Sequence, residues 1–360
     1  MPKQVYLDYN ATAPVLPVAA EAVAEALRAG GNPSSVHGVG RAARARMEDA
    51  REAVAHLVAA RPDQVIFTSG GTEAVALALH GFAGAPALVS AIEHPCVLEA
   101  LPGAERIPVS SDGVVDLAWL AERLERGPAP AVVAVMLANN ETGVVQPVAE
   151  VAALARKVGA LVFCDAVQGP GKITVDLDGL GVDFLVLSAH KMGGPQGIGA
   201  LIARVPESVT ALVRGGGQER GRRGGTQNTP GIAGFGAAAR RCTPLLPALR
   251  DRLEAGIRRI APQAIIWGEG AARLPNTTCV GLPGIDQQRQ LMALDLAGVA
   301  VSAGSACSSG KVAPSHVLTA MGASADQARQ AVRVSLGWAT RAEDIDRFLD
   351  AWVRLVPAAA

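Results

Sequence analysis

The chain lacks several features that would mark it as a metal-binding, disulfide-rich or nucleic-acid-binding protein. Its 360 residues include five cysteines and no Cys-x-x-Cys pair, which argues against a zinc site and a disulfide framework, so we expect no metal. Positive and negative residues balance to a formal net charge of zero. No basic tail or stripe is present to neutralise phosphates, and we therefore expect no nucleic-acid partner.

Long apolar runs are also missing. No uncharged stretch reaches the length needed to cross a bilayer. The first ten residues, MPKQVYLDYN, lack both the apolar core and the Arg/Ser-rich pattern of targeting segments. We therefore expect a soluble, cytoplasmic protein with no membrane partner.

Apolar residues are abundant, without low-complexity tracts. They make up 49% of the chain, which is typical of a globular rather than a disordered protein. A chain of 360 residues is too long for one small core. This length suits a large α/β domain with a smaller appendage.

Six short apolar runs alternate with helix-patterned stretches between about residues 45 and 240. The runs cover residues 65–68, 87–90, 132–137, 161–164, 184–187 and 199–203. They are rich in Val, Ile and Leu, and apolar throughout rather than at every second position. This pattern predicts strands buried on both faces of a mostly parallel sheet flanked by helices. One such helix is expected over residues 148–158, ending before Gly159.

The pattern changes after about residue 243. Helical patterns near residues 246–260, 287–296 and 342–353 mix with short strand patterns around residues 265, 278, 301 and 332. This mixture predicts a smaller α+β domain. We expect a large domain over residues 16–243 and a small domain made of residues 1–15 and 244–360.

Polar motifs follow three of the runs, and ligands of open parallel sheets bind outside the carboxyl ends of the strands. Ser69-Gly-Gly-Thr-Glu73 follows the first run and precedes a helical pattern. Gly71 lets the backbone approach a ligand, and the free N–H groups of a helix N-terminus attract anions, with the Thr72 hydroxyl as a further donor. The motif predicts a phosphate cup. A plain turn in which Thr72 caps the helix is the alternative.

Asp165 follows the run over residues 161–164, and Gln168 comes three residues later. A carboxylate at a buried strand end has to be paired or hydrogen-bonded. Asp165 could hold a pyridinium nitrogen protonated, because a cationic ring is the better electron sink. The alternative is that it caps the next segment.

Lysine is scarce in this chain. The five lysines are Lys3, Lys157, Lys172, Lys191 and Lys311. Only Lys191 directly follows a buried run, with Ser188 and His190 beside it. A desolvated amine has a lowered pKa and can act as a Schiff-base nucleophile, although most lysines are surface residues. We expect Lys172, which follows a Gly-Pro-Gly turn, to be solvated.

A phosphate cup, a ring-nitrogen carboxylate and a Schiff-base lysine at one sheet edge together indicate a pyridoxal-phosphate site. Ordered motifs along the chain strengthen this interpretation. They are residues 6–12 (YLDYNAT), 31–35 (GNPSS), 68–73 (TSGGTE), 93–95 (EHP), 139–143 (NNETG), 165–168 (DAVQ), 188–191 (SAHK), 215–220 (GGGQER), 225–226 (GT), 302–307 (SAGSAC) and 333–337 (RVSLG). With them the chain resembles the class V aminotransferase superfamily of fold-type I enzymes, and within it the cysteine desulfurases of the NifS/IscS kind.

The resemblance implies that Lys191 carries pyridoxal 5′-phosphate and that L-cysteine is the substrate. His94 would stack on the cofactor ring, whereas alone it would be interpreted as a helix-capping or core histidine. The resemblance also implies that Asn140 and Gln168 bind the phenolic oxygen of the cofactor and that Asn32 and Arg333 bind the substrate carboxylate. The cofactor phosphate would be bound by Gly71, Thr72, Ser188 and His190, together with Thr226 from the partner subunit of a homodimer.

Cys307 lies in a run of small residues, Ser302-Ala-Gly-Ser-Ala-Cys-Ser-Ser-Gly310, with no core-forming side chains. A Gly/Ser-rich segment suits a mobile loop that carries a nucleophile. The resemblance implies that the Cys307 thiolate takes the substrate sulfur as a persulfide, releases alanine and passes the sulfur to an acceptor protein such as an iron–sulfur scaffold. The other cysteines differ in context: we expect Cys96, Cys164 and Cys279 to be structural and leave Cys242 open.

Three alternatives remain at this point. A class V aminotransferase would not need Cys307, whereas a selenocysteine lyase would share nearly all of the site chemistry. A non-catalytic assembly partner would be expected to lose Lys191 or Cys307, and both are present. The chain also has Ala74-Val-Ala-Leu77 where the resembled family usually has an asparagine.

Overall fold

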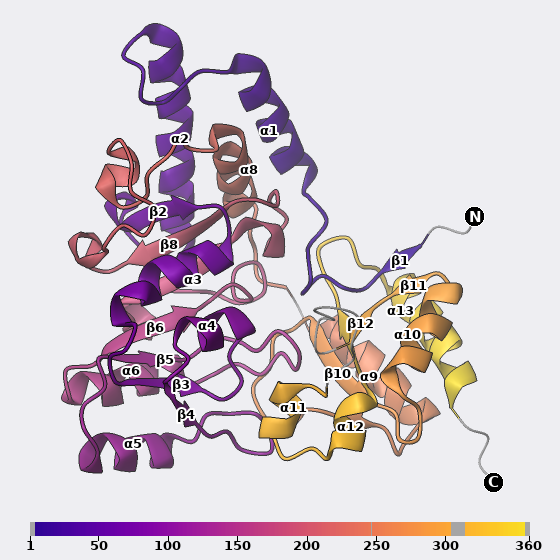
Figure 1. The fold of residues 1–360 in the computed structure, drawn as a ribbon. Helices are drawn as coiled ribbons and strands as arrows, with labels where there is room; N and C mark the ends of the chain where they lie inside the picture. Colours follow the sequence, from indigo (N-terminus) through magenta and orange to yellow (C-terminus); the bar gives the residue numbers. More distant parts are fainter. Residues whose placement is uncertain (1–3, 246, 304–313, 357–360) are drawn as a thin grey trace.

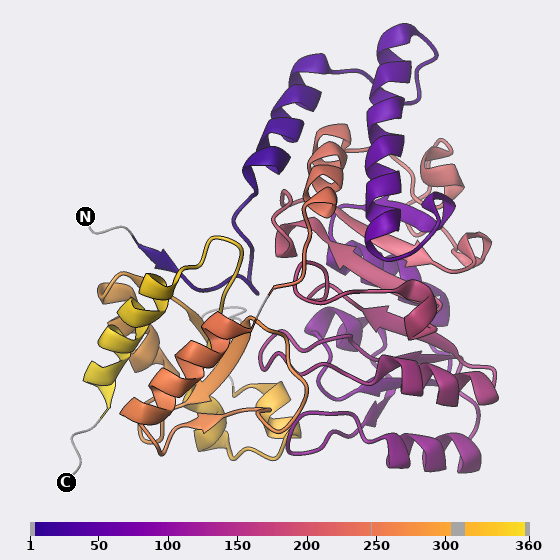
Figure 2. The same ribbon diagram turned by 180° about the vertical axis from the view of Figure 1, so that it is seen from behind.

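The computed structural model describes residues 4–245, 247–303 and 314–356 (Figure 1). Cys307 and Lys311 therefore lie outside the described residues. Two sheet-based parts are evident in both views, a larger one that contains most of the first 240 residues and a smaller one that contains both ends of the described chain (Figures 1 and 2).

The larger part is built on a seven-stranded sheet. Its strands are β2 (Val65–Thr68), β3 (Ala87–Ser90), β4 (Glu105–Ile107), β5 (Val132–Ala134), β6 (Leu161–Asp165), β7 (Phe184–Ser188) and β8 (Gly199–Ala203). They lie in the order β2-β8-β7-β6-β5-β3-β4, and β8 runs antiparallel to both neighbours while the other pairs are parallel. The predicted mostly parallel α/β sheet is confirmed.

Each predicted apolar run forms a strand, because side chains on both faces of the sheet are buried. Every residue of β2, β3, β5, β7 and β8 is buried. The edge strand β4 was not predicted, since two of its three residues, Glu105 and Arg106, are charged and exposed. A strand this short, with charged residues at two of its positions, does not form an apolar run in the sequence.

Helices cover this sheet. They are α1 (Pro17–Ala29), α2 (Gly38–Leu57), α3 (Gly71–Leu79), α4 (Pro95–Ala100), α5 (Leu117–Arg126), α6 (Val148–Lys157), α7 (Leu177–Leu180) and α8 (Thr229–Arg240). Helix α6 ends one residue before the predicted limit, and Gly159 follows it with a φ of 74°. Helices α1 and α2 both pack against α8 and extend away from the sheet (Figure 1). Gly236 allows this packing, since a Cβ atom there would lie 2.6 Å from Ala50 Cα.

The smaller part contains a four-stranded antiparallel sheet. Its strands, in spatial order, are β12 (Ser302–Ala303), β13 (Ala331–Ser335), β10 (Thr277–Gly281) and β9 (Ile265–Ile266). The helices of this part are α9 (Ala248–Ile260), α10 (Gln287–Leu296), α11 (His316–Ala320), α12 (Ala325–Arg329) and α13 (Ala342–Trp352). These elements match the predicted helices and the strands around residues 265, 278 and 332, while residue 301 lies between two short strands.

The N-terminal residues pack with this smaller part. Strand β1 (Val5–Tyr6) pairs in parallel with β11 (Val299–Ala300). Leu7 belongs to the same apolar core as Phe348 and Trp352 of α13. The chain therefore begins in one part, crosses to the other and returns, so the connection after residue 7 passes between them.

A buried ion pair fixes the segment around residues 215–220 to the large sheet. The guanidinium of Arg51 donates to both carboxylate oxygens of Glu219 at 2.8 and 3.0 Å and lies 4.7 Å from the centre of the Phe67 ring. Glu219 also accepts the Phe67 backbone N–H at 3.0 Å and has a φ of 45°. The hydrogen bonds hold a backbone conformation that is unfavourable for a non-glycine residue.

We expect the Glu219→Gln substitution to lower the free energy of unfolding by about 3 kcal/mol, because it removes the buried counter-charge of Arg51 and leaves only Glu48, whose side chain is 42% exposed. Glu207→Gln is the matched control: the Glu207–Arg222 pair has a carboxylate that is 73% exposed, so its loss should cost less than about 1 kcal/mol. Urea unfolding of both variants measures the difference. Equal losses would contradict a special role for the buried pair.

Candidate functional site

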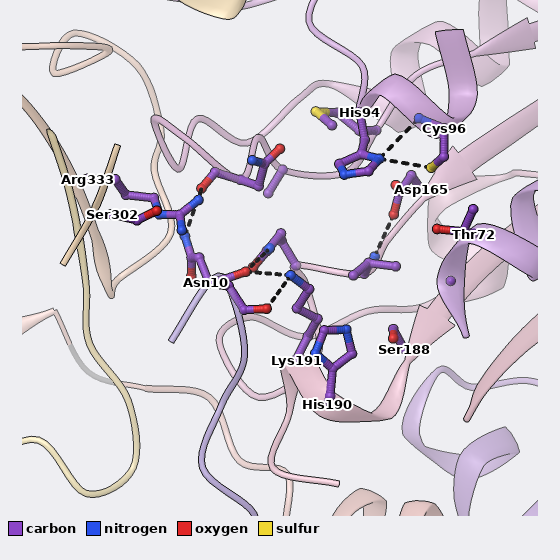
Figure 3. Close-up of a pocket in the computed structure, with 17 residues that line it drawn as sticks. Asn10, Thr72, His94, Cys96, Asp165, Ser188, His190, Lys191, Ser302 and Arg333 are labelled. Atoms are coloured by element: carbon purple, nitrogen blue, oxygen red, sulfur yellow. Dashed lines mark hydrogen bonds between the residues drawn. The ribbon is translucent and has the colours of Figure 1, made fainter. Parts of the chain in front are cut away.

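A cavity of about 340 Å³ lies where the carboxyl ends of β6 and β7 face the smaller part of the molecule (Figure 3). Of the thirteen residues predicted to act in the site, ten line it. These are Gly71, Thr72, His94, Asn140, Asp165, Gln168, Ser188, His190, Lys191 and Arg333. Residues more than 250 positions apart in the chain thus line one cavity. For the residues of the large sheet this is expected, because ligands of open parallel sheets bind outside the carboxyl ends of the strands.

The N-terminus of α3 opens into this cavity. Gly70 occupies the N-cap position, so the alternative in which Thr72 caps the helix is wrong. Gly199 in β8 makes this placement possible, because a Cβ atom there would lie 2.6 Å from Gly70 C and 2.8 Å from Leu187 O. The free N–H groups at Gly71 and Thr72 therefore face the cavity, where an anion would be stabilised.

Lys191 follows β7 in a single 3₁₀ turn, Ala189–Lys191. Its Nζ donates to the carbonyls of Asn10 at 2.6 Å and Ala11 at 2.8 Å, as the dashed lines in Figure 3 indicate. Burial, and next the positive charge of Arg333, lower the pKa of Lys191 to about 8. A fraction of the amine is therefore unprotonated and nucleophilic near neutral pH, which is the property predicted from its position.

Asp165, the last residue of β6, is 8% exposed and accepts a hydrogen bond from Val167 N–H at 3.0 Å. Burial raises the pKa of this carboxyl, while the hydrogen bond, His94 and Lys191 oppose the rise. The carboxylate faces the cavity without a hydrogen-bonded cation among the described residues (Figure 3). A protonated ring nitrogen placed in the cavity would supply the missing positive partner.

His94 both caps a helix and lines the cavity, so neither interpretation excludes the other. Its Nδ1 accepts the Cys96 backbone N–H at 3.2 Å, at the start of α4. A neutral imidazole that accepts at Nδ1 carries its proton on Nε2. Burial lowers the pKa of His94, and the nearby Asp165 opposes this. Stacking of the ring on a cofactor stays a prediction.

Arg333 enters the cavity from β13 of the smaller part. It is 4% exposed, donates to Asp8 Oδ1 at 2.6 Å and to Asn140 O at 3.1 Å, and its buried Nε has no partner among the described residues. An unpaired buried donor is unfavourable unless a ligand satisfies it. This atom is therefore the feature of Arg333 that fits a carboxylate ligand.

His190 and Ser188 line the cavity beside Lys191 (Figure 3). The Nδ1 atom of His190 lies 3.2 Å from Thr12 Oγ1. Burial, and next the positive charge of Lys191, lower the pKa of His190 to about 4. The imidazole is consequently neutral at physiological pH and can donate one hydrogen bond without carrying a charge.

Three predicted residues do not line the cavity. Asn32 is exposed in the connection between α1 and α2, where its side chain accepts Ser34 N–H at 2.9 Å. Thr226 is also exposed and borders a separate, smaller cavity with Phe67. Cys307 lies outside the described residues.

The expectation for Lys172 is wrong. Lys172 is not solvated but 4% exposed, because the turn at Gly169 folds it back beneath Gln168. Cys96, which we expect to be structural, lines the cavity, with its Sγ 3.0 Å from His94 Nδ1. Burial raises the pKa of the Cys96 thiol to about 12. Asn10 and Ser302 also line the cavity and were missed, although both lie in motifs that the sequence made visible.

Among the residues that the structure describes, no group of three His, Cys, Asp or Glu side chains is arranged to hold a metal ion. None of the helices in the same residues is long and apolar enough to cross a membrane.

Comparisons with known proteins give a consistent result. The model of the class V aminotransferase family matches residues 5–348. A cysteine desulfurase from Cereibacter sphaeroides is 44% identical over an alignment of 367 positions, gaps included, which covers 97% of this chain and 94% of that protein. The cysteine desulfurase IscS of Dictyoglomus turgidum is 37% identical over an alignment of 377 positions, gaps included, which covers 99% of this chain and 95% of that protein.

Solved structures agree with these relatives. A NifS-like protein from Rickettsia africae superposes with a TM-score of 0.90 at 34% identity, over 98% of this chain and 100% of that one. A structure of SspA in complex with cysteine gives a TM-score of 0.83 at 30% identity, over 92% of this chain and 98% of that one.

Proposed function

The chain belongs to the class V aminotransferase family, among its cysteine desulfurases, and we propose that it removes sulfur from L-cysteine with pyridoxal 5′-phosphate bound in the cavity. The observation that carries this proposal is that a buried carboxyl, Asp165, and a nucleophilic amine, Lys191, line the same cavity. The cavity size, the open N-terminus of α3 and the unpaired Nε of Arg333 all fit a cofactor with a phosphate and a substrate with a carboxylate.

Each cofactor group has a counterpart in the chain. The N–H groups at Gly71 and Thr72, with Ser188 and neutral His190, would hold the phosphate. Asp165 would hold the ring nitrogen, and Asn140 and Gln168 would bind the phenolic oxygen. When bound, the cofactor supplies an aldehyde carbon for a covalent bond to an amine and a ring that accepts electrons from the substrate α-carbon.

The residues of the chain then bind the substrate and move its protons. Arg333 would hold the L-cysteine carboxylate, with Nε as the free donor. Lys191 Nζ would accept the proton of the substrate α-carbon, and His94 Nε2 would serve as a further proton carrier within the cavity. The Cys307 thiolate would form a bond to the substrate sulfur while the carbon–sulfur bond breaks and the carbon takes up a proton. The products are alanine and a persulfide on Cys307.

Incubating the reconstituted protein with L-cysteine and a reductant tests this function. We expect alanine and sulfide in equal amounts, without any keto-acid acceptor. A requirement for a keto acid would instead indicate an aminotransferase. A rate on selenocysteine far above the rate on cysteine would indicate a selenocysteine lyase.

The pKa of Lys191 leads to a pH prediction. Only the unprotonated amine attacks an aldehyde, so the recombination rate of apoprotein with pyridoxal 5′-phosphate should rise with pH and level off above about 8. The Arg333→Met substitution removes a positive charge that lowers this pKa, so the midpoint should move to higher pH. Stopped-flow absorbance measures the rates. A wild-type rate that still rises steeply near the ordinary lysine pKa of about 10.4 would contradict the account.

We also propose a cytoplasmic homodimer that passes sulfur to an acceptor such as an iron–sulfur scaffold protein. Exposed apolar side chains on and beyond α1, such as Leu27 and Val36, lie at 65% and 88% exposure. Pro33 and Ser34, which lie between them in the sequence, border one cavity together with residues between Gly216 and Gln227. Pro33 and Gln227, the sequence neighbours of Asn32 and Thr226, border this same cavity, which supports a common role of the two segments at the partner subunit's site. A monomer by light scattering would contradict this.

A further inference from the structure

A second buried lysine, Lys172, borders a smaller cavity that shares Lys191 with the main one. Lys172 is 4% exposed, and its Nζ donates to Gln168 Oε1 at 2.5 Å. The turn that buries it is closed by hydrogen bonds from the backbone N–H groups of Lys172 and Ile173 to Gly169 O. Among the described residues this Nζ has no carboxylate partner, so its one hydrogen bond is to the amide of Gln168. A lysine buried in this way is uncommon unless its amine has a role.

Gln168 connects this lysine to the catalytic one. Its Nε2 donates to Asn10 O at 3.0 Å, and the same carbonyl accepts from Lys191 Nζ at 2.6 Å. Asn10 is itself held, since its backbone N–H donates to Ser335 Oγ at 3.0 Å. Lys172 and Lys191 are therefore linked through the Gln168 amide and the Asn10 carbonyl, and all of these groups are buried or partly buried.

These contacts allow only one orientation of the Gln168 amide. An ammonium group can only donate and a backbone carbonyl can only accept. Turning the amide by 180° would set its NH₂ group against the Lys172 ammonium and its oxygen against Asn10 O. The orientation is thus determined by chemistry on both sides rather than by shape alone. It leaves the second N–H of Nε2 available to the cavity that Gln168 lines.

We propose that Lys172 is a positioning residue that holds the Gln168 amide so that its N–H group, and not its carbonyl, faces the bound cofactor. This inference rests on the proposed function, since it requires pyridoxal 5′-phosphate in the cavity. Burial, and next the positive charge of Lys191, lower the pKa of Lys172 to about 7. The amine can donate to Oε1 in either protonation state, and its protonated form fixes the amide most firmly.

The test compares cofactor-loaded variants. Lys172→Met removes the donor and keeps the side-chain length. We expect the visible absorption band of the bound cofactor to shift in wavelength, and the apparent Kd for pyridoxal 5′-phosphate to rise about tenfold, the size of one charge-assisted hydrogen bond. Lys172→Arg keeps a donor and has room in the adjoining cavity of about 80 Å³, so it should restore the band. Lys157→Met, at an exposed lysine that ends α6, is the matched control.

A double-substitution cycle separates positioning from a general structural role. If Lys172 acts through Gln168, Lys172→Met should add little to the spectral shift and Kd of Gln168→Met. Additive effects, or a Lys172→Met spectrum identical to wild type, would overturn the inference. If the wild-type protein itself fails to bind the cofactor, the proposed function fails instead, and the two failures are thereby distinguished.

Discussion

The Lys191→Ala variant is expected to lose L-cysteine turnover by about 10⁴-fold or more, the scale on which loss of a catalytic nucleophile acts. The reason is that Lys191 Nζ is the amine placed for both covalent attachment of the cofactor and proton transfer at the substrate. Among the lysines that the structure describes, Lys172 is the other buried one, but its Nζ donates to Gln168 Oε1. Alanine production under saturating L-cysteine measures the loss.

Two further results are expected with this loss of turnover. Lys157→Ala, at an exposed lysine, should turn over L-cysteine at the wild-type rate. The Lys191→Ala protein should still bind the cofactor, but sodium borohydride should no longer fix it to the chain. Retention of more than a few per cent of wild-type turnover by Lys191→Ala would show that another amine carries out the chemistry.

The Cys307→Ser variant is expected to lose desulfuration by about 10³-fold while keeping the cofactor spectrum, because a hydroxyl is a far weaker nucleophile than a thiolate. The competing thiol is Cys96, which lines the cavity. Burial raises the pKa of Cys96 to about 12, so at neutral pH it is almost entirely a thiol and a poor nucleophile. Alanine release under single-turnover conditions measures the effect.

A Cys96→Ser variant separates the two thiols. If Cys96 received the sulfur, its loss would abolish sulfide release and Cys307→Ser would retain it. Cys242→Ser serves as the control, since Cys242 lies outside the main cavity and burial raises its pKa to about 12. We expect the Cys242→Ser protein to behave as wild type.

Much of the site was predictable because the large sheet follows simple rules. Apolar runs identify strands buried on both faces, and the residues after β6 and β7 must lie at one edge of a parallel sheet. Asp165, Ser188 and Lys191 therefore belong together before any coordinates are considered. The lowered pKa of Lys191 follows from the same position, because a strand end covered by other elements excludes water.

Other features depend on packing between distant segments and leave no local signal. From the sequence, Lys172 is predicted to be a solvated loop lysine, because it follows a Gly-Pro-Gly turn. Only the folded turn brings its Nζ into contact with Gln168. Arg333 reaches the cavity from the smaller part and Asn10 from the connection between the two parts, and only the family resemblance indicated Arg333. The thiol of Cys96 faces the cavity because α4 starts at Pro95, one residue after the capping histidine.

The most direct test of the central claim is to locate the cofactor on the chain. Holoprotein reduced with sodium borohydride and digested would be analysed by tandem mass spectrometry for the residue that carries the pyridoxyl group. The structure predicts the group on Lys191 in nearly all labelled peptides. A pyridoxyl group mainly on Lys172, or none on any peptide of a protein that still produces alanine from L-cysteine, would contradict the account.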